Sequence, residues 1–168
     1  VSKLPLVYRY GTIKYFGIGL PNLHHEQTIA KLDMLMMHHM TPTLVQQHLQ
    51  QSMEQLQLEV GIGAHFLTQS YDIYGHYCTK CWLQSLWKDI STLPIQIVIN
   101  NRPSLPLYRE NDAHIMKDII SLRTCSITEL IAINRVRLHH RSYALSHIVT
   151  GDGTQYKNCL LYTSDAAD

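Results

Sequence analysis

Residues 23–60, LHHEQTIAKLDMLMMHHMTPTLVQQHLQQSMEQLQLEV, decide the fold class of this chain. Apolar residues recur in this stretch every three to four positions, which is the period of one face of an α-helix. They form two stripes, the first of Ile29, Leu32, Met36 and Met40 and the second of Val45, Leu49, Met53, Leu56 and Val60. Thr41 and Pro42 between the stripes are typical of an N-cap and a first helical position, and Gly61 is a typical C-terminal stop. The stretch therefore predicts two amphipathic helices in an antiparallel hairpin.

Three further helices are predicted downstream. Thr79 can cap the first, and the residues that share its inner face are Trp82, Leu83, Leu86, Trp87 and Ile90. The second runs over 110–122 and turns four apolar residues inward, namely Ile115, Met116, Ile119 and Ile120. The third opens with Ser126 and Glu129, which have the spacing of a capping box, and reaches about His139.

Extended structure is predicted in two places. Residues 4–15 mix β-branched and aromatic side chains, and Ile95–Ile99 is the best candidate strand of the chain. The predicted fold class is mainly α, with about five amphipathic helices and a few short extended segments in an incomplete domain.

The composition indicates an ordered globular segment. Hydrophobic residues make up 45 % of the 168 residues and charged residues 16 %, so disorder is not expected over most of the length. No run approaches the roughly 18 apolar residues that span a bilayer, and we expect no membrane partner.

The last ten residues, CLLYTSDAAD (159–168), look like one translated frame of an adaptor used to build sequencing libraries. We expect them to be a non-native tail, the alternative being a natural polar tail. Without them the chain has 14 basic and 11 acidic residues, a net charge of +3. Its cysteines are then Cys78, Cys81 and Cys125, too few for a disulfide framework, which favours a reducing compartment.

Four parts of the chain carry a resemblance to a known family. They are GIGLPNLHHEQTIAKLDMLMMHH with LQQSMEQLQLEVG (17–39 and 49–61), WLQSLWKDI (82–90), LPLYREND-x-x-IM (105–116) and IAINRVRLHHRSYALSHIVTGDG (131–153). In order and spacing they resemble the region downstream of the polymerase palm in eukaryotic retroelement polyproteins of the non-LTR type. The resemblance implies that residues 1–22 end a preceding polymerase region, that 23–61 form a thumb-like or connection-like hairpin, and that 62–158 form a helical post-polymerase region.

The same resemblance implies a parent polypeptide that is an RNA-directed DNA polymerase. That chemistry requires carboxylates that hold two metal ions, usually with an aromatic-x-Asp-Asp turn. No two acidic residues are adjacent here, and the aspartates upstream of the tail are scattered as Asp33, Asp72, Asp89, Asp112, Asp118 and Asp152. We therefore expect no catalytic residue and no cofactor in this chain.

Two groups of residues are weak candidates for a metal site. Cys78-x-x-Cys81, with His76 nearby, has the spacing of half a zinc site, but the remaining ligands would have to come from Cys125, His114 or the pair His139-His140, at spacings of no common finger. Buried small apolar groups are the favoured interpretation of the two cysteines. Glu110, Asp112 and His114 could form a nuclease-like site, but acids in the first turn of a helix are the favoured alternative.

The basic residues are the candidate nucleic-acid contacts. Lys14, Lys31, Arg135, Arg137 and Arg141 would suit the phosphate backbone of a template–primer duplex if they lie on one face. The alternative is that the cationic run 135–141 complements a helix dipole and is otherwise a solvated face.

The predicted function is a non-catalytic one. The chain is expected to pack beside the polymerase of its parent polypeptide and to contact the backbone of the template–primer, so its predicted partners are the remainder of that polypeptide and RNA or DNA. A protein-interaction or scaffold segment is the alternative, which large exposed apolar patches would favour. A decayed retroelement fragment with no present function is a further alternative.

Overall fold

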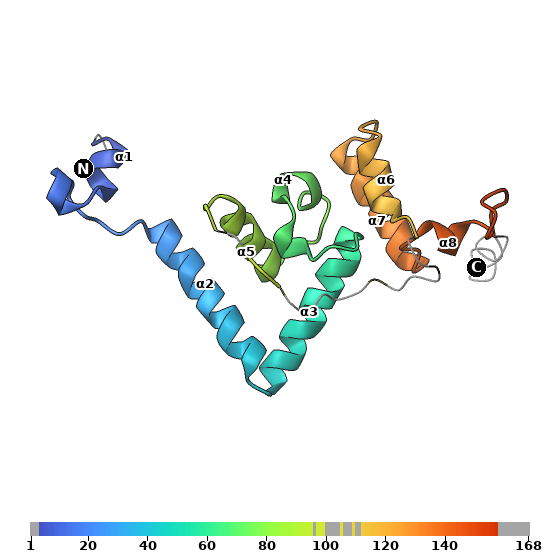
Figure 1. Cartoon of the computed structure of the whole chain (residues 1–168), viewed down its shortest axis with the longest axis horizontal. Helices are drawn as coiled ribbons and strands as arrows, with labels where there is room; N and C mark the ends of the chain where they lie inside the picture. Colours follow the sequence, from blue (N-terminus) through green and yellow to red (C-terminus); the bar gives the residue numbers. More distant parts are fainter. Residues whose placement is uncertain (1–3, 96, 100–104, 106–108, 110–111, 158–168) are drawn as a thin grey trace.

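The fold consists of helices joined by turns and loops (Figure 1). The structure, a computed structural model, describes residues 4–95, 97–99, 105, 109 and 112–157. Over this part of the chain five helices have seven residues or more and no sheet forms, so the predicted mainly α class is confirmed. None of the helices in the described ranges is long and apolar enough to cross a bilayer.

The two helices of the first prediction are α2 (Leu23–Met40) and α3 (Leu44–Val60), which form the arms of a V (Figure 1). α3 ends where expected, because Gly61 adopts the left-handed conformation with φ of 70°. The predicted N-cap is wrong by two residues. The side chain of Thr43, not that of Thr41, caps the first turn of α3, and Thr41 instead follows the last turn of α2.

The core centres on Trp87 of α5 (Trp82–Ser91). The Trp87 ring packs edge-on against Phe66 of the 3-10 helix η2 (Phe66–Thr68) and Tyr71 of α4 (Tyr71–Tyr74), with centroids 5.5 and 5.3 Å away. Its Nε1 donates to the Gln69 carbonyl at 2.9 Å. The other apolar residues buried in this core are Leu35, Leu56, Val60, Ile62, Leu67, Tyr77, Cys78, Leu83, Leu86, Ile90 and Met116.

The helix α5 confirms most of its predicted inner face. Four of the expected residues are buried and Trp82 is 37 % exposed. The predicted cap Thr79 lies too early, because the helix begins at Trp82 and the Cys81 sulfur accepts the capping hydrogen bond at 3.4 Å. Thr79 instead donates its backbone N–H to the Glu59 carboxylate at 2.7 Å.

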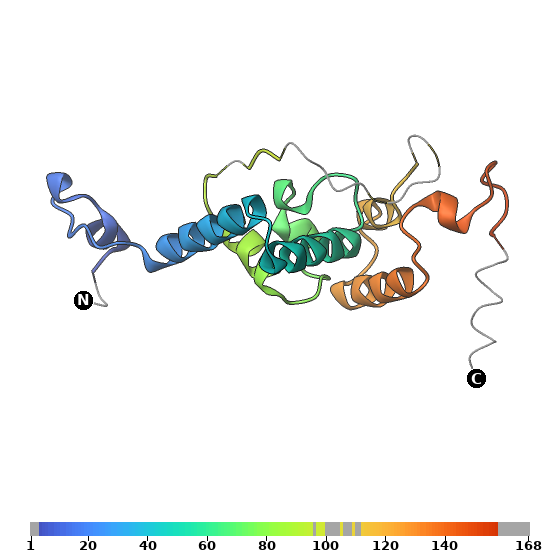
Figure 2. The same cartoon turned by 90° about the horizontal axis from the view of Figure 1, so that it is seen from below.

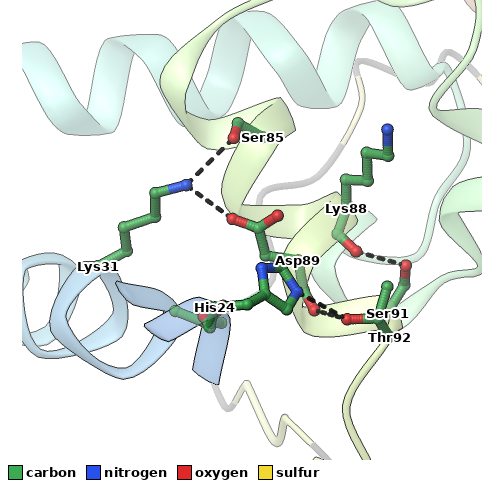
Figure 3. Close-up of polar contacts among 8 residues, drawn as sticks. His24, Lys31, Ser85, Lys88, Asp89, Ser91 and Thr92 are labelled. Atoms are coloured by element: carbon green, nitrogen blue, oxygen red, sulfur yellow. Dashed lines mark hydrogen bonds and ion pairs between the residues drawn. The ribbon is translucent and has the colours of Figure 1, made fainter. Parts of the chain in front are cut away.

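The inward face of α2 overlaps the predicted one only at Leu32, which is partly buried and packs against the core. Ile29, Met36 and Met40 are 47, 62 and 81 % exposed, whereas Thr28 and Leu35 are buried. Figure 3 shows the polar contacts that accompany this orientation: the Lys31 ammonium lies 2.7 Å from Asp89 and 3.2 Å from Ser85 on α5, and the His24 ring lies 3.2 Å from the Thr92 hydroxyl. Apolar periodicity carries no information on such contacts between helices. It therefore did not predict which face of α2 turns toward α5.

The two predicted extended segments are not strands in the described structure. Residues 4–15 contain α1 (Leu6–Tyr10) and η1 (Ile13–Tyr15). With no adjacent strand to pair with, local hydrogen bonds satisfy their backbone groups. Ile97 and Ile99 pack against the core, but 95 and 97–99 belong to no strand.

Three helices complete the fold: α6 (Ile115–Ser121), α7 (Ile127–His139) and α8 (Leu145–Ile148). Both hydrogen bonds of the predicted capping box at Ser126 are present and α7 ends at His139, so this helix is confirmed. The prediction for α6 was too long at its N-terminal end, where Glu110 lies outside the described residues.

Candidate interaction surface

The N-terminal segment 4–20 exposes nearly all of its apolar side chains. Phe16 is 92 % exposed, Val7 80 % and Ile13 78 %. The segment folds on itself, because the N–H groups of Ile18 and Leu20 donate to carbonyls of the α1 helix at 2.8 and 3.0 Å. Both views place it at one end of the molecule, away from the core (Figures 1 and 2). A folded segment with so much bare apolar area is typical of one that another body covers.

The outward side of α2, which follows the N-terminal segment in the chain, is also rich in exposed apolar residues. Its most exposed methionines are Met36, Met37 and Met40, at 62, 62 and 81 %. Beyond the turn, Leu44 at the start of α3 is 73 % exposed. We use the name apolar surface for residues 4–20 together with Leu23, Ile29, Met34, Met36, Met37, Met40, Leu44 and Val45.

The charges on α2 are acidic on the exposed side. Glu26 and Asp33 are seven residues apart, about two turns, and both are exposed. The helix has one lysine, Lys31, which turns toward Asp89 on α5, and no arginine. The apolar surface on α2 therefore offers no Lys or Arg to a phosphate backbone.

Arg137, predicted to contact nucleic acid, is buried with 4 % of its surface exposed. Its guanidinium donates to the Asn134 side chain and to the carbonyls of Leu58 and Glu59 at the end of α3, the last at 2.8 Å. It also lies over the Tyr143 ring, 5.5 Å from the centroid. Burial lowers the pKa of Arg137, but an arginine stays charged at any ordinary pH. Arg137 thus attaches α7 to the negative end of α3, and its burial keeps it from a phosphate.

The other predicted basic residues do not all share one face. Lys31 is paired with Asp89, as described above. Lys14, Arg135 and Arg141 are exposed and form no ion pair with any described residue. Lys14 lies in the N-terminal segment, at the opposite end of the molecule from α7, which carries Arg135 (Figures 1 and 2).

The predicted cysteine pair is divided between the core and the surface. Cys78 is buried and its thiol donates to the Tyr74 carbonyl at 3.3 Å, and burial raises the pKa of this thiol. Cys81 is exposed and caps α5, so the prediction of two buried groups is wrong for it. The exposed His76 packs against the Tyr71 ring, 5.3 Å between centroids. In the part of the chain that the structure describes, no three His, Cys, Asp or Glu side chains are grouped to hold a metal ion.

Asp112 has a structural role instead of a place in the first turn of a helix. It lies before α6, and its carboxylate accepts from the backbone N–H and the hydroxyl of Ser146 on α8. Burial raises the pKa of this carboxyl, but the hydrogen bonds from Ser146 and the nearby Arg109 outweigh burial, so the net pKa is lowered. The adjacent His114 has a pKa lowered by burial and by Lys117.

Gln57 and His65 are among the buried polar residues that the sequence did not single out. The Gln57 amide donates to the carbonyls of Ile62 and Ala64, both at 2.8 Å, and accepts from the Phe66 N–H at 2.9 Å. His65 is buried beside Phe66, and burial together with the charge of His39 lowers its pKa to about 4. Gln57 lies beside the apolar stripe of α3 in the sequence. That position alone does not show whether a polar residue at the edge of a helix face is buried or exposed.

Comparison with known proteins finds no relative of this chain. No family model matches the chain, and neither a curated protein nor a solved structure is significantly similar to it.

Proposed function

We propose that this chain is a non-catalytic helical segment of a larger reverse-transcriptase-like polypeptide and that it packs against the polymerase part through the apolar surface. The observation that carries the proposal is the large number of exposed apolar side chains on three consecutive parts of the chain, namely the N-terminal segment, α2 and the first turn of α3. Large exposed apolar patches are rare on monomeric proteins and mark interaction surfaces.

The polymerase part is the occupant that the chain favours. The resemblance implies that residues 1–22 end a polymerase region. Backbone N–H groups of Ile18 and Leu20 bond to carbonyls of α1 within this segment, while its apolar side chains face outward. A segment that belongs to a preceding body is expected to behave in this way once that body is absent. Because the segment leads directly into α2, the same body would also reach the exposed methionines.

The proposal is tested by recovering the reading frame upstream in the source DNA and co-expressing its product with this chain. The expected result is an upstream aromatic-x-Asp-Asp turn and a stable complex between the two parts. The double variant Val7→Glu/Met37→Glu should weaken the complex by well over tenfold, because each buried apolar side chain contributes about 1.5–3 kcal/mol.

Matched controls lie elsewhere on the same chain. Ile73→Glu on α4 and Val136→Glu on α7 also place a carboxylate on an apolar residue that is about half exposed, 51 and 59 %. They should leave the complex intact. If the variants and the controls bind equally, or if the isolated chain buries the apolar surface in a dimer that Val7→Glu abolishes, the proposed partner is wrong.

A contact with the template–primer backbone is a second proposal of smaller scope. It depends on Arg135 and Arg141, which lie within and just after the last turns of α7 and are exposed. Sequence-independent binding that weakens steeply with salt would support it. Because Arg137 is buried and Lys31 is paired with Asp89, few cationic side chains are left to contact the phosphate backbone.

A further inference from the structure

The last turns of α2 concentrate sulfur and imidazole side chains. Residues 34–40 read MLMMHHM, so four of the six methionines of the chain lie within seven residues, beside two adjacent histidines. The other two methionines are on α3 and α6, where Met53 is partly buried and Met116 is fully buried. The function proposed above requires only that these side chains be apolar, and leucine would serve equally well.

We propose that the last turn of α2 binds a soft monovalent metal ion of the Cu(I) class, held by the thioether sulfurs of Met36 and Met40 and the imidazole of His39. This site goes beyond the proposed function and does not depend on it; because Met36 and Met40 also belong to the apolar surface, the ion and the polymerase part compete for them. Two thioether donors favour a soft ion such as Cu(I), and an imidazole suits copper as well; Mg²⁺ and Ca²⁺ instead prefer carboxylate or carbonyl oxygens. The set of two sulfurs and one nitrogen offers three ligands to one ion.

The helical spacing brings the three donors together. Met36 stands three residues before His39 and four before Met40, so it is a neighbour of each on the helix surface, about 5–6 Å apart at Cβ, and the two lie one turn further on, on either side of it. Met36 and Met40 are 62 and 81 % exposed and His39 is exposed as well, so an ion can reach all three. The long, flexible methionine side chains can adjust to the ion without moving the backbone.

The backbone of this turn is held in place from outside the helix. The Gln46 side chain on α3 donates to the His39 carbonyl at 3.0 Å, and the Thr41 hydroxyl donates to the Met37 carbonyl at 2.9 Å. These contacts fix the turn that carries the donors, so binding has less backbone freedom to remove.

The local field also favours a cation. The C-terminus of a helix carries a partial negative charge, and α2 has 18 residues that contribute to it. Asp33 lies seven residues before Met40, about two turns away on the same side of the helix, and is exposed. Lys31 is directed toward Asp89 on α5 and so does not oppose a bound ion.

A second set with the same spacing exists but is less suited. Met34, Met37 and His38 are also at i, i+3 and i+4, yet Met34 is the least exposed of the four methionines at 49 % and His38 is half-buried. We therefore assign the ion to Met36, His39 and Met40 and use Met34 as the matched control.

The experiment is a titration of the full chain with Cu(I), kept reduced without oxygen, against a coloured Cu(I) chelator, and with Ag⁺ as a redox-inert probe. Cys81, Cys125 and Cys159 are first replaced by Ser so that thiolates do not compete; Ser is a good N-cap, so Cys81→Ser preserves the start of α5. One equivalent should bind. Met36→Leu/Met40→Leu and His39→Gln should each weaken binding at least about tenfold, whereas Met34→Leu and His25→Gln should not.

Each result is decisive because the substituted side chains are exposed and leucine keeps them apolar. Far-UV circular dichroism of every variant should match that of the parent. Absence of binding by the parent, binding that survives Met36→Leu/Met40→Leu, or equal weakening by Met34→Leu would overturn the assignment. The leucine variants should still bind the polymerase part, so failure of the metal site and failure of the proposed docking are read separately.

Discussion

Replacing Arg137, which joins α7 to the end of α3, is expected to destabilise the fold strongly. Its guanidinium is buried and donates to two carbonyls at the end of α3 and to Asn134. Arg137→Met keeps a long apolar stem but leaves these acceptors without a donor. Hydrogen bonds to a charged group contribute about 1.5–3 kcal/mol each, and removing the buried charge returns several kcal/mol of desolvation. We expect a net loss of about 2–3 kcal/mol in the free energy of unfolding.

Urea unfolding followed by the fluorescence of Trp87 and by circular dichroism measures this loss. Arg135→Met is the matched control, because Arg135 is on the same helix but exposed, and such surface changes are usually within about 0.5 kcal/mol. If Arg137→Met and Arg135→Met unfold at the same urea concentration, the guanidinium does not hold α7 to α3 and the reasoning fails.

Gly61 supplies an independent check on the same contact. A Cβ at Gly61 would lie 2.9 Å from the Arg137 guanidinium, and the residue has φ of 70°, which costs a non-glycine residue about 1 kcal/mol. Gly61→Ala should therefore be more costly in the parent chain than in the Arg137→Met background, where only the backbone cost is left. Equal costs in the two backgrounds would mean that the guanidinium does not lie against this turn.

Three further outcomes are expected. Trp87→Ala should cost about 3–5 kcal/mol in urea unfolding, since it empties the centre of the core. The free energy of unfolding should fall as the pH drops from about 6.5 to about 4, because the lowered pKa of His65 lets the unfolded chain bind a proton before the folded one. His65→Asn should reduce the dependence of stability on pH. The remaining dependence should come from His114, whose pKa is also lowered. If α7 contacts a duplex backbone, the logarithm of affinity should fall with the logarithm of salt concentration with a slope of about −2 for two cations, and Arg135→Ala/Arg141→Ala should flatten it in filter binding.

Local rules predicted some helix ends and missed others: the caps expected at Thr41 and Thr79 lie two residues before the actual caps Thr43 and Cys81. The glycine stop at Gly61 and the capping box at Ser126 depend on neighbouring residues only, and both are confirmed. The inward face of α2 depends on contacts with α5, where Lys31 meets Asp89 across 58 positions of sequence. No periodicity within one helix contains that information.

The site residues were predicted less well for the same reason. Arg137 lies in a basic run, which indicates a solvated face, yet it is the residue that reaches the carbonyl end of α3, 78 positions earlier. Its neighbour Arg135 has the same chemistry and is exposed. The difference arises from the rotation of α7 against α3, and only the packing of the two helices determines it.

The two faces of α2 bear on the proposed function together. A helix that is apolar on one side is typical of a surface helix, whereas one that is apolar all round is typical of a buried helix. α2 buries Leu35 against the core on one side and leaves Met36, Met37 and Met40 bare on the other. α2 is thus buried on one side and carries exposed methionines on the other. Because the acidic Glu26 and Asp33 share the bare side with these methionines, a basic and apolar partner surface fits it better than a nucleic acid does.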